Sequence, residues 1–193
     1  PGVINFSHGS PPKEFFPVRH MQDAINAVID RDGANALMYE VPEGYLPLRV
    51  AVRDYVRALG IQCRFEDVLI TGGAQQAIDL VLQALMSEGE TLVTADPTYL
   101  GIMDIGHARR VHIHGIPVDE DGIRIDALEN YLHDNTPRLI YVMPSFQNPT
   151  GHVMPLHRRR QLIRLAERYQ IPVLEDEVYR EFRFDGEHLP PLK

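Results

Sequence analysis

Two short apolar runs, each followed at once by a cluster of polar and aromatic residues, constrain the fold of this chain more than any other feature. Residues 139–143 (LIYVM) precede the segment PSFQNPTG at 144–151, and residues 171–174 (IPVL) precede EDEVY at 175–179. Such short apolar runs are typical of buried strands in a parallel sheet. Because open α/β sheets bind ligands at the carboxyl ends of their strands, the two polar segments predict a shared binding site.

The rest of the sequence also predicts strands that alternate with helices over most of the chain. Strands and helices alternate from residue 67 onward, which predicts an α/β fold with a mostly parallel sheet and helices on both faces. The expected strands are 67–71, 91–95, 110–116, 139–143 and 171–174, and the expected helices are 21–29, about 47–59, 74–86, 126–132 and 156–169. A chain of 193 residues is long enough to bury a substantial core.

The two polar segments would bring an amide, a carboxylate and a phenol to one place, from Asn148, Asp176 and Tyr179. A heteroaromatic cofactor with a ring nitrogen and a ring hydroxyl could use all three groups. Pyridoxal 5'-phosphate (PLP) is such a cofactor, and its pyridinium nitrogen commonly pairs with an aspartate or an arginine. The residues alone therefore make PLP the leading candidate.

Three motifs in order resemble one known family. The segments ITGGAQQAIDL (70–80), PSFQNPTG (144–151) and EDEVYREF (175–182) resemble the fold-type I PLP-dependent aminotransferases, in the branch of the aminoadipate and kynurenine aminotransferases. The aminotransferase-like domains of GntR/MocR-type regulators carry similar motifs. The resemblance covers nearly all of the chain. It implies that residues 46–193 form the front part of the PLP-binding large domain, incomplete at the C-terminus. Residues 1–45 would form an N-terminal arm and helix at the interface of a homodimer.

The resemblance implies a phosphate site at Gly73, Ala74 and Gln75. A strand, a glycine turn and a helix N-terminus can bind an anion through unpaired N–H groups and the helix dipole. The two consecutive glycines alone would indicate only a tight connection. Many relatives carry serine where Ala74 stands, so one side-chain hydrogen bond to the phosphate is expected to be missing here.

The resemblance also assigns contacts to the cofactor ring and the substrate. Tyr99 would stack on the pyridine ring, and Asp176 would keep the ring nitrogen protonated. Asn148 would bind the ring oxygen and help to seat the substrate carboxylate, while Tyr179 would approach the ring oxygen. Without the resemblance, Asp176 could cap a helix and both tyrosines could be packed aromatic residues. The Asn148–Pro149 bond is a candidate cis peptide.

Two further assignments fall in the first 45 residues. The resemblance implies that Tyr39 reaches the cofactor phosphate of the neighbouring subunit, and that Gly9 lines the substrate site. The alternative for Tyr39 is a loop tyrosine packed for its area.

No catalytic residue is expected in this chain. PLP aminotransferases need a lysine that forms the Schiff base and moves the α-proton. The chain has two lysines: Lys13 lies among prolines and Lys193 is the last residue. In the family the lysine follows a further strand beyond the Asp-and-Tyr motif, and so does the arginine for the substrate carboxylate. Because the chain starts at Pro1 and ends without a closing element, we expect a fragment that is inactive by itself.

Composition and charge limit which other classes of protein this chain could belong to. The formal net charge of −8 argues against broad affinity for nucleic acid. The single cysteine, Cys63, excludes an internal disulfide and is consistent with a cytoplasmic protein. No run is apolar enough for a membrane span. His112 and His114 alternate on one strand, and residues 158–160 (RRR) begin a helix. We expect both groups to face solvent, and we predict no metal site.

Two main classes of function stay open. One is an aminotransferase that acts on an L-amino acid and a 2-oxo acid such as 2-oxoglutarate. The other is the effector-sensing domain of a transcription regulator, which a winged-helix segment before Pro1 would favour. A PLP lyase or decarboxylase on the same fold is a third possibility, because the orientation of the substrate above the ring selects the reaction.

Overall fold

The computed structural model of the chain describes residues 11–192, which form two compact units divided between Pro42 and Glu43. The first unit contains a 3-10 turn at Lys13–Phe15, helix α1 at Val18–Asp32 and a second 3-10 turn at Gly33–Leu37. The helix expected at 21–29 is therefore present and longer. No residue of α1 is buried, and its apolar stripe is exposed.

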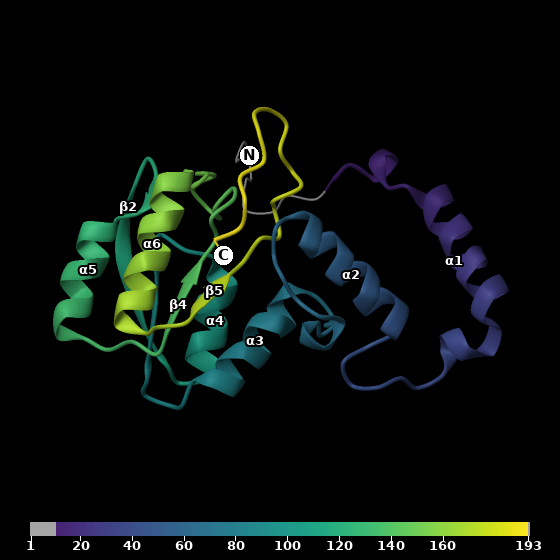
Figure 1. Cartoon of the computed structure of the whole chain (residues 1–193), viewed down its shortest axis with the longest axis horizontal. Coiled ribbons are helices and arrows are strands. Elements are labelled where there is room, and N and C mark those ends of the chain that lie inside the picture. Colours follow the sequence, from purple (N-terminus) through teal and green to yellow (C-terminus); the bar gives the residue numbers. More distant parts are fainter. Residues whose placement is uncertain (1–10, 193) are drawn as a thin grey trace, which may run out of the picture. The chain divides into compact units, whose positions relative to one another are not determined.

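The second unit is built on a five-stranded sheet with the order β3-β2-β1-β4-β5 (Figure 1). The strands are β1 (Thr91–Asp96), β2 (His112–Asp119), β3 (Gly122–Ile123), β4 (Leu139–Val142) and β5 (Val173–Glu175). Strand β1 pairs in parallel with β2 and β4, and β4 pairs in parallel with β5. Only the short hairpin of β2 and β3 is antiparallel within the described part of the sheet. The prediction of a mostly parallel sheet is confirmed.

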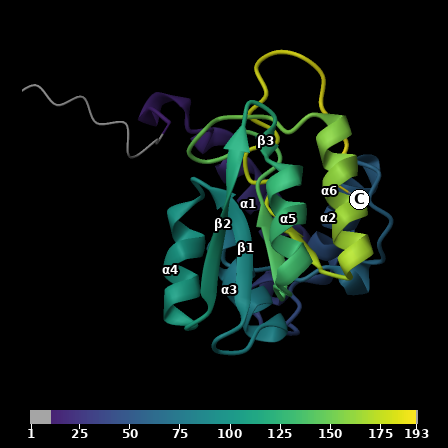
Figure 2. The ribbon, with the colours of Figure 1, turned by 90° about the vertical axis from the view of Figure 1, so that its left-hand side faces the viewer.

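Helices cover both faces of this sheet. The helices of this unit are α2 (Leu46–Ala58), α3 (Ala74–Leu85), α4 (Leu100–Ala108), α5 (Ile125–Asp134) and α6 (Leu156–Tyr169). Helices α5 and α6 lie side by side on one face, and α3 and α4 lie on the other (Figures 1 and 2). The sequence analysis did not predict α4. Its apolar positions and its close-packed glycines show no simple polar face, which is why periodicity did not reveal it.

Two apolar cores result, one on each side of the sheet. Strand residues Val93, Ile140 and Val142 pack with Leu162 of α6 in the first core. Strand residues of the second core point to the opposite face and pack against α3 and α4; this core contains Leu92, Leu139, Tyr141, Ile78, Leu82, Ile102 and Ile105. Because successive strand residues point to opposite faces, a continuous apolar run such as 139–143 can serve both cores.

The strand predicted at 67–71 is absent, so this prediction is wrong. Phe65–Asp67 is a 3-10 turn, and residues 68–71 have no strand partner among the residues that the structure describes. Backbone groups in this segment form hydrogen bonds to a side chain and to a loop instead of to a neighbouring strand. The guanidinium of Arg49 donates to the carbonyls of Val68 and Phe65, and the N–H of Ile70 donates to the carbonyl of Glu43. An apolar run becomes a strand only where a neighbouring strand can pair with it.

The expectation of a solvated arginine group at the start of α6 is also wrong. Arg159 is 1% exposed, and Arg158 is half-buried with Nη2 at 2.9 Å from Oδ2 of Asp119. Of the three arginines only Arg160 is exposed. Similarly, His112 is exposed as predicted, whereas His114 is half-buried and its ring stacks on Tyr131 with a centroid distance of 3.8 Å. Among residues 11–192, no helix combines the length and the apolar character needed to cross a lipid bilayer.

Candidate cofactor site

A small cavity of about 80 Å³ lies where β4 and β5 end and α3 and α4 begin. It is lined by Ala74, Tyr99, Met143, Asp176, Val178 and Tyr179. Four of these six residues, Ala74, Tyr99, Asp176 and Tyr179, were singled out from the sequence as cofactor residues. The parallel strands bring them together, because their carboxyl ends meet at one edge of the sheet.

Asp176 follows β5 directly and is almost fully buried. Its N–H donates to the carbonyl of Val142, which fixes the backbone against the end of β4. Its Oδ2 accepts a hydrogen bond of 2.7 Å from the phenol of Tyr141. Burial, followed by the nearby charge of Asp176, raises the pKa of Tyr141, so the phenol stays protonated and acts as the donor. The carboxylate is thus held in one orientation at the wall of the cavity.

The N-terminus of α3 forms the anion-binding part of the site. Gly73 is the N-cap residue with φ +120°, a backbone conformation that favours glycine, and no side chain caps the helix. The preceding turn is fixed, because the N–H of Gly72 donates to Oε1 of Gln76 and the hydroxyl of Thr71 donates to the carbonyl of Gly73. The first N–H groups of α3 therefore remain free of side-chain caps, as an anion site requires.

Tyr99 is the N-cap residue of α4, and its ring is held from two sides. Its phenol donates a hydrogen bond of 2.7 Å to Oε1 of Gln75. The ring also lies against the backbone of Gly101, where an added Cβ would stand only 2.3 Å from Cε1 of Tyr99. A glycine at this position lets the aromatic ring lie flat along the helix. The side chain of Gln75 therefore positions Tyr99, a contact that the sequence analysis did not foresee.

The loop at 144–151 carries Asn148 and is organised by Gln147, which is 7% exposed. Nε2 of Gln147 donates to the carbonyl of Pro97, and Oε1 accepts from both the N–H and the hydroxyl of Thr150. Gln147 thus ties this loop to the loop that follows β1. The Asn148–Pro149 peptide bond is cis, as predicted, and so is Asp96–Pro97.

Asn148 itself is half-buried and does not line the cavity. Its side chain makes no hydrogen bond with the residues that the structure describes, so its amide is available to a ligand. Gln147 belongs to the motif at 144–151, but the sequence alone predicted no role for it. The signal that could have revealed it is a glutamine three residues before a threonine in a Pro-rich loop, since the backbone polar groups of such a loop need partners.

Two assignments fall in the first 42 residues, which precede the unit that contains the cavity. Tyr39 belongs to the first unit, and its side chain is fully exposed within this chain. Gly9 lies outside the described residues. Lys13 is exposed in the first 3-10 turn, and Lys193 lies outside the described residues.

The donor set at the cavity fits PLP on chemical grounds. A buried, oriented carboxylate suits a protonated ring nitrogen, an aromatic ring suits stacking, and an uncapped helix N-terminus suits a phosphate. The residues that would hold the group are Asp176, Tyr99 and the start of α3 from Gly73. A free amide and a phenol, from Asn148 and Tyr179, remain for the ring oxygen.

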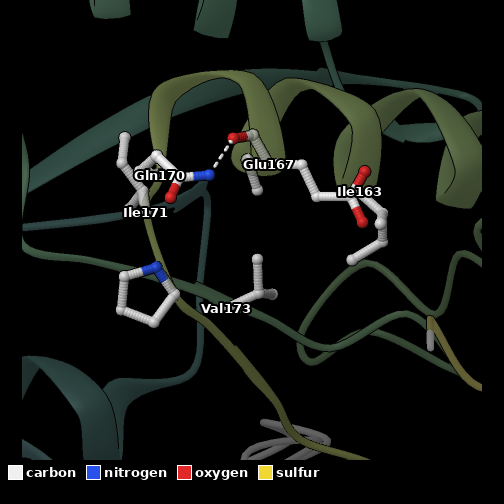
Figure 3. A pocket seen from close by; sticks show the side chains of 7 residues that line it. Ile163, Glu167, Gln170, Ile171 and Val173 are labelled. Atoms are coloured by element: carbon white, nitrogen blue, oxygen red, sulfur yellow. Dashed lines mark hydrogen bonds between the residues drawn. The ribbon is translucent and has the colours of Figure 1, made fainter.

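A larger hollow of about 490 Å³ lies at the other end of β5 (Figure 3). It is lined by the last turns of α6 and by Ile171, Pro172 and Val173, and Nε2 of Gln170 donates to the carbonyl of Glu167 at its rim. Its walls are mainly aliphatic, and it faces the amino ends of the strands. Parallel sheets bind ligands at the opposite edge, so the small cavity is the better candidate despite its size.

Comparison with known proteins agrees with this site. The fold and the cavity residues are those expected of the PLP-dependent aminotransferase class. A family model for class I and II aminotransferases matches residues 1–191. The 2-aminoadipate transaminase of Thermus thermophilus is 38% identical over 192 residues, which cover 100% of this chain and 47% of that protein. The chain belongs to the class I and II aminotransferase family.

Two further comparisons bear on function. The crystal structure of an α-aminoadipate aminotransferase from Thermus thermophilus, complexed with N-(5'-phosphopyridoxyl)-L-leucine, has a TM-score of 0.87 and 38% identity. The match covers 97% of this chain and 47% of that one. An uncharacterized helix-turn-helix-type transcriptional regulator of Bacillus subtilis is 32% identical over 98% of this chain and 38% of the regulator. The chain thus spans about half the length of these aminotransferases and a smaller share of the regulator. Membership of this family makes PLP the cofactor.

Proposed function

We propose that the full-length protein containing this chain is a PLP-dependent aminotransferase that moves an amino group from an L-amino acid to a 2-oxo acid such as 2-oxoglutarate. The observation that carries the proposal is the convergence of Ala74, Tyr99, Asp176 and Tyr179 on one cavity. Family membership and the 38% identity to a 2-aminoadipate transaminase support it.

Bound PLP supplies an electron sink for the carbanion that forms at the substrate Cα. In our proposal the carboxylate of Asp176 holds a proton on the ring nitrogen, which strengthens that sink. Tyr141 keeps the carboxylate oriented toward the ring through its hydrogen bond. The ring of Tyr99, which lines the cavity, would stack on the pyridine and shield it from water.

The remaining groups would bind the polar parts of the cofactor and the substrate. The N–H groups at Gly73, Ala74 and Gln75 would hold the phosphate through the dipole of α3. The amide of Asn148 would donate to the ring oxygen and help to seat the substrate carboxylate. The phenol of Tyr179 would also donate to the ring oxygen.

The rest of the active site would come from elsewhere in the protein. We propose a cytoplasmic homodimer in which Tyr39 binds the cofactor phosphate of the neighbouring subunit and Gly9 lines the substrate site. We further propose that a lysine outside this chain forms the Schiff base and moves the α-proton. The isolated chain is then expected to be inactive.

The test is the visible absorption of the full-length protein with PLP, before and after the addition of a panel of L-amino acids that includes 2-aminoadipate. The bound cofactor should lose its visible band with the true amino donor and regain it with 2-oxoglutarate. Asp176→Asn should reduce kcat/KM by about 100-fold or more, since it removes a preorganised charge, whereas Asp185→Asn in the exposed loop should have no effect. A protein whose band never completes this cycle would refute the proposal.

A second candidate is the effector-sensing domain of a transcription regulator, which is favoured by the 32% identity to a Bacillus subtilis regulator. Some regulators of this kind place the tyrosine one residue nearer the aspartate than the spacing of Asp176 and Tyr179 found here. Retarded migration of promoter DNA by the full-length protein, together with a band that shifts without completing the cycle, would establish this second function.

A further inference from the structure

We propose that Arg159 is a positioning residue for the cofactor site: it clamps the loop that carries Asn148 to the loop that carries Asp176 and Tyr179. The proposal rests on PLP as the cofactor of the proposed function, but it does not depend on which reaction follows. Arg159 lies on the first turn of α6, which packs along β4 and β5 (Figures 1 and 2).

The guanidinium of Arg159 is completely enclosed, with 1% of the residue exposed. Nε donates to the carbonyl of Met154 at 2.9 Å, and Nη2 donates to the carbonyl of Pro144 and to Oγ of Ser145, both at 3.0 Å. Nη1 donates to the carbonyl of Pro190 at 2.9 Å and to Oε1 of Glu177 at 3.4 Å. The five hydrogen bonds match the five N–H groups of an arginine.

Three of the five acceptors, on Pro144, Ser145 and Glu177, belong to the two loops of the cofactor site. Pro144 and Ser145 open the segment that leads to Asn148, immediately after β4. Glu177 stands between Asp176 and Tyr179. The hydroxyl of Ser145 also donates to Oε1 of Glu177 at 3.0 Å. This carboxylate oxygen therefore links the two loops in two ways, directly to Ser145 and through the guanidinium of Arg159.

The clamp acts where small displacements matter most. Asp176 is the residue before Glu177 and Tyr179 follows two residues later, so a shift of Glu177 changes the direction of both side chains. A cofactor held by several groups at once requires each of them to lie within a fraction of an ångström of its place. Fixing the two loops to one rigid side chain meets that requirement.

The chemistry of the site explains why arginine stands here. Its planar guanidinium presents donors in a fixed fork, whereas a lysine offers three donors from a single point and cannot reach all five acceptors. A buried cation is tolerated when it is paired and fully hydrogen-bonded, and Glu177 supplies the counter-charge. Lysine at this position would keep the charge but release one of the loops.

The experiment measures binding of pyridoxamine 5'-phosphate to the full-length protein freed of cofactor. This form carries no aldehyde, so its dissociation constant reports the non-covalent contacts alone. The variants are Arg159→Lys and, on the opposite side of the same link, Glu177→Gln and Ser145→Ala. Visible circular dichroism of the PLP-bound protein provides a second readout, because it depends on how the cofactor is oriented.

Arg158→Lys is the matched control. Arg158 is adjacent on the same helix and is half-buried, but it donates to the carbonyl of Ile123 at 2.7 Å and to Asp119 at 2.9 Å, which lie at the β2–β3 hairpin. Losing these contacts should lower the unfolding temperature without moving the cofactor loops. Both arginine variants are therefore compared at a temperature well below unfolding.

We expect Arg159→Lys to raise the dissociation constant at least tenfold and to change the visible circular dichroism, while Arg158→Lys changes the constant less than twofold. Glu177→Gln should raise the dissociation constant by a smaller factor. In the double variant with Arg159→Lys, the increase should be less than the product of the two single increases, because both changes break the same link. If Arg159→Lys does not fold, the dissociation constants of Ser145→Ala and Glu177→Gln test the proposal instead.

The proposal is overturned if the Arg159, Glu177 and Ser145 variants bind the cofactor as the Arg158 control does, even when their unfolding temperatures fall. The role of Arg159 would then be limited to holding α6 in place. A wild-type protein that binds pyridoxamine 5'-phosphate but transfers no amino group would refute the proposed function alone.

Discussion

The phenol of Tyr141 and the carboxylate of Asp176 form a buried hydrogen bond of 2.7 Å across the ends of β4 and β5. Tyr141 is completely buried and Asp176 is 8% exposed. Tyr141 is not among the described residues that line the cavity, so it orients the carboxylate of Asp176 without forming part of the cavity wall. A group behind a ligand-binding residue commonly fixes its direction in this way.

Replacing Tyr141 with phenylalanine should weaken cofactor binding while keeping the fold. A hydrogen bond to a charged group contributes about 1.5–3 kcal/mol, so the dissociation constant for pyridoxamine 5'-phosphate should rise by roughly tenfold or more. The measurement is a binding titration on the full-length protein. Tyr131→Phe is the control, because Tyr131 stacks on His114 and packs against the core on the face of the sheet covered by α5 and α6, whereas Tyr99 of the cavity packs against the core on the other face. Equal affinities for the two variants would contradict the expectation.

Replacing Gly101 with alanine should displace the ring of Tyr99. The new Cβ would stand 2.3 Å from the ring and 2.6 Å from Oε1 of Gln75, so the ring must move. Because stacking contributes about 0.5–1.5 kcal/mol, cofactor affinity should fall about three- to tenfold. Gly106→Ala is the matched control on the same helix. Its Cβ would meet Ile113 at 2.5 Å, so it should destabilise the fold but leave cofactor affinity unchanged.

Replacing Gln147 with leucine should destabilise the loop at 144–151. The substitution leaves the carbonyl of Pro97 and the N–H of Thr150 without their buried partner, and each unsatisfied group costs about 1–3 kcal/mol. Thermal unfolding of the full-length protein should therefore shift down by several degrees. Gln83→Leu, at an exposed position on α3, should leave the transition where it is. A Gln147→Leu transition that also stays in place would show that the loop does not need this amide.

Stability should fall as the pH rises toward neutrality because of Glu175. Burial, and then the charge of Glu177, raise the pKa of Glu175 to about 7, although the N–H of Leu192 opposes the shift. Arg180 and Tyr55 line the same cavity. The folded state holds a proton that the unfolded state releases near pH 4.5. The stabilising contribution is therefore complete below that pH and disappears as the pH rises through about 7.

The check is the unfolding temperature of wild type and Glu175→Gln between pH 5 and 8. Glutamine is neutral throughout this range, so the unfolding temperature of the variant should fall less than that of wild type as the pH rises. The difference should be a few degrees, since one kcal/mol corresponds to about 2–4 °C in a domain of this size. Glu187→Gln, in an exposed loop, should follow the wild-type curve. Parallel curves for wild type and Glu175→Gln would show that Glu175 is ionised across the whole range.

Much of the fold could be predicted from local patterns. The apolar stripe of α6 predicted Leu156–Tyr169 to the residue, and the apolar run before PSFQNPTG predicted β4. The polar segments after β4 and β5 pointed to Asp176 and Tyr179, and the structure places both at the wall of one cavity. These successes share a cause: hydrophobic periodicity and strand-end chemistry are properties of neighbouring residues.

Other features could not be predicted because they depend on distant partners. Residues 68–71 are apolar enough for a strand, but no described strand pairs with them. Three consecutive arginines indicate a solvated face, yet Arg159 is buried among acceptors from three separate segments. The sequence by itself determined most of the helices and parallel strands, though not α4 or the fate of residues 68–71, and it indicated which polar residues gather at the edge of the sheet. Only the tertiary structure decided which side chains stand behind them, such as Tyr141 and Arg159, because burial and hydrogen-bond geometry arise when residues far apart in sequence meet.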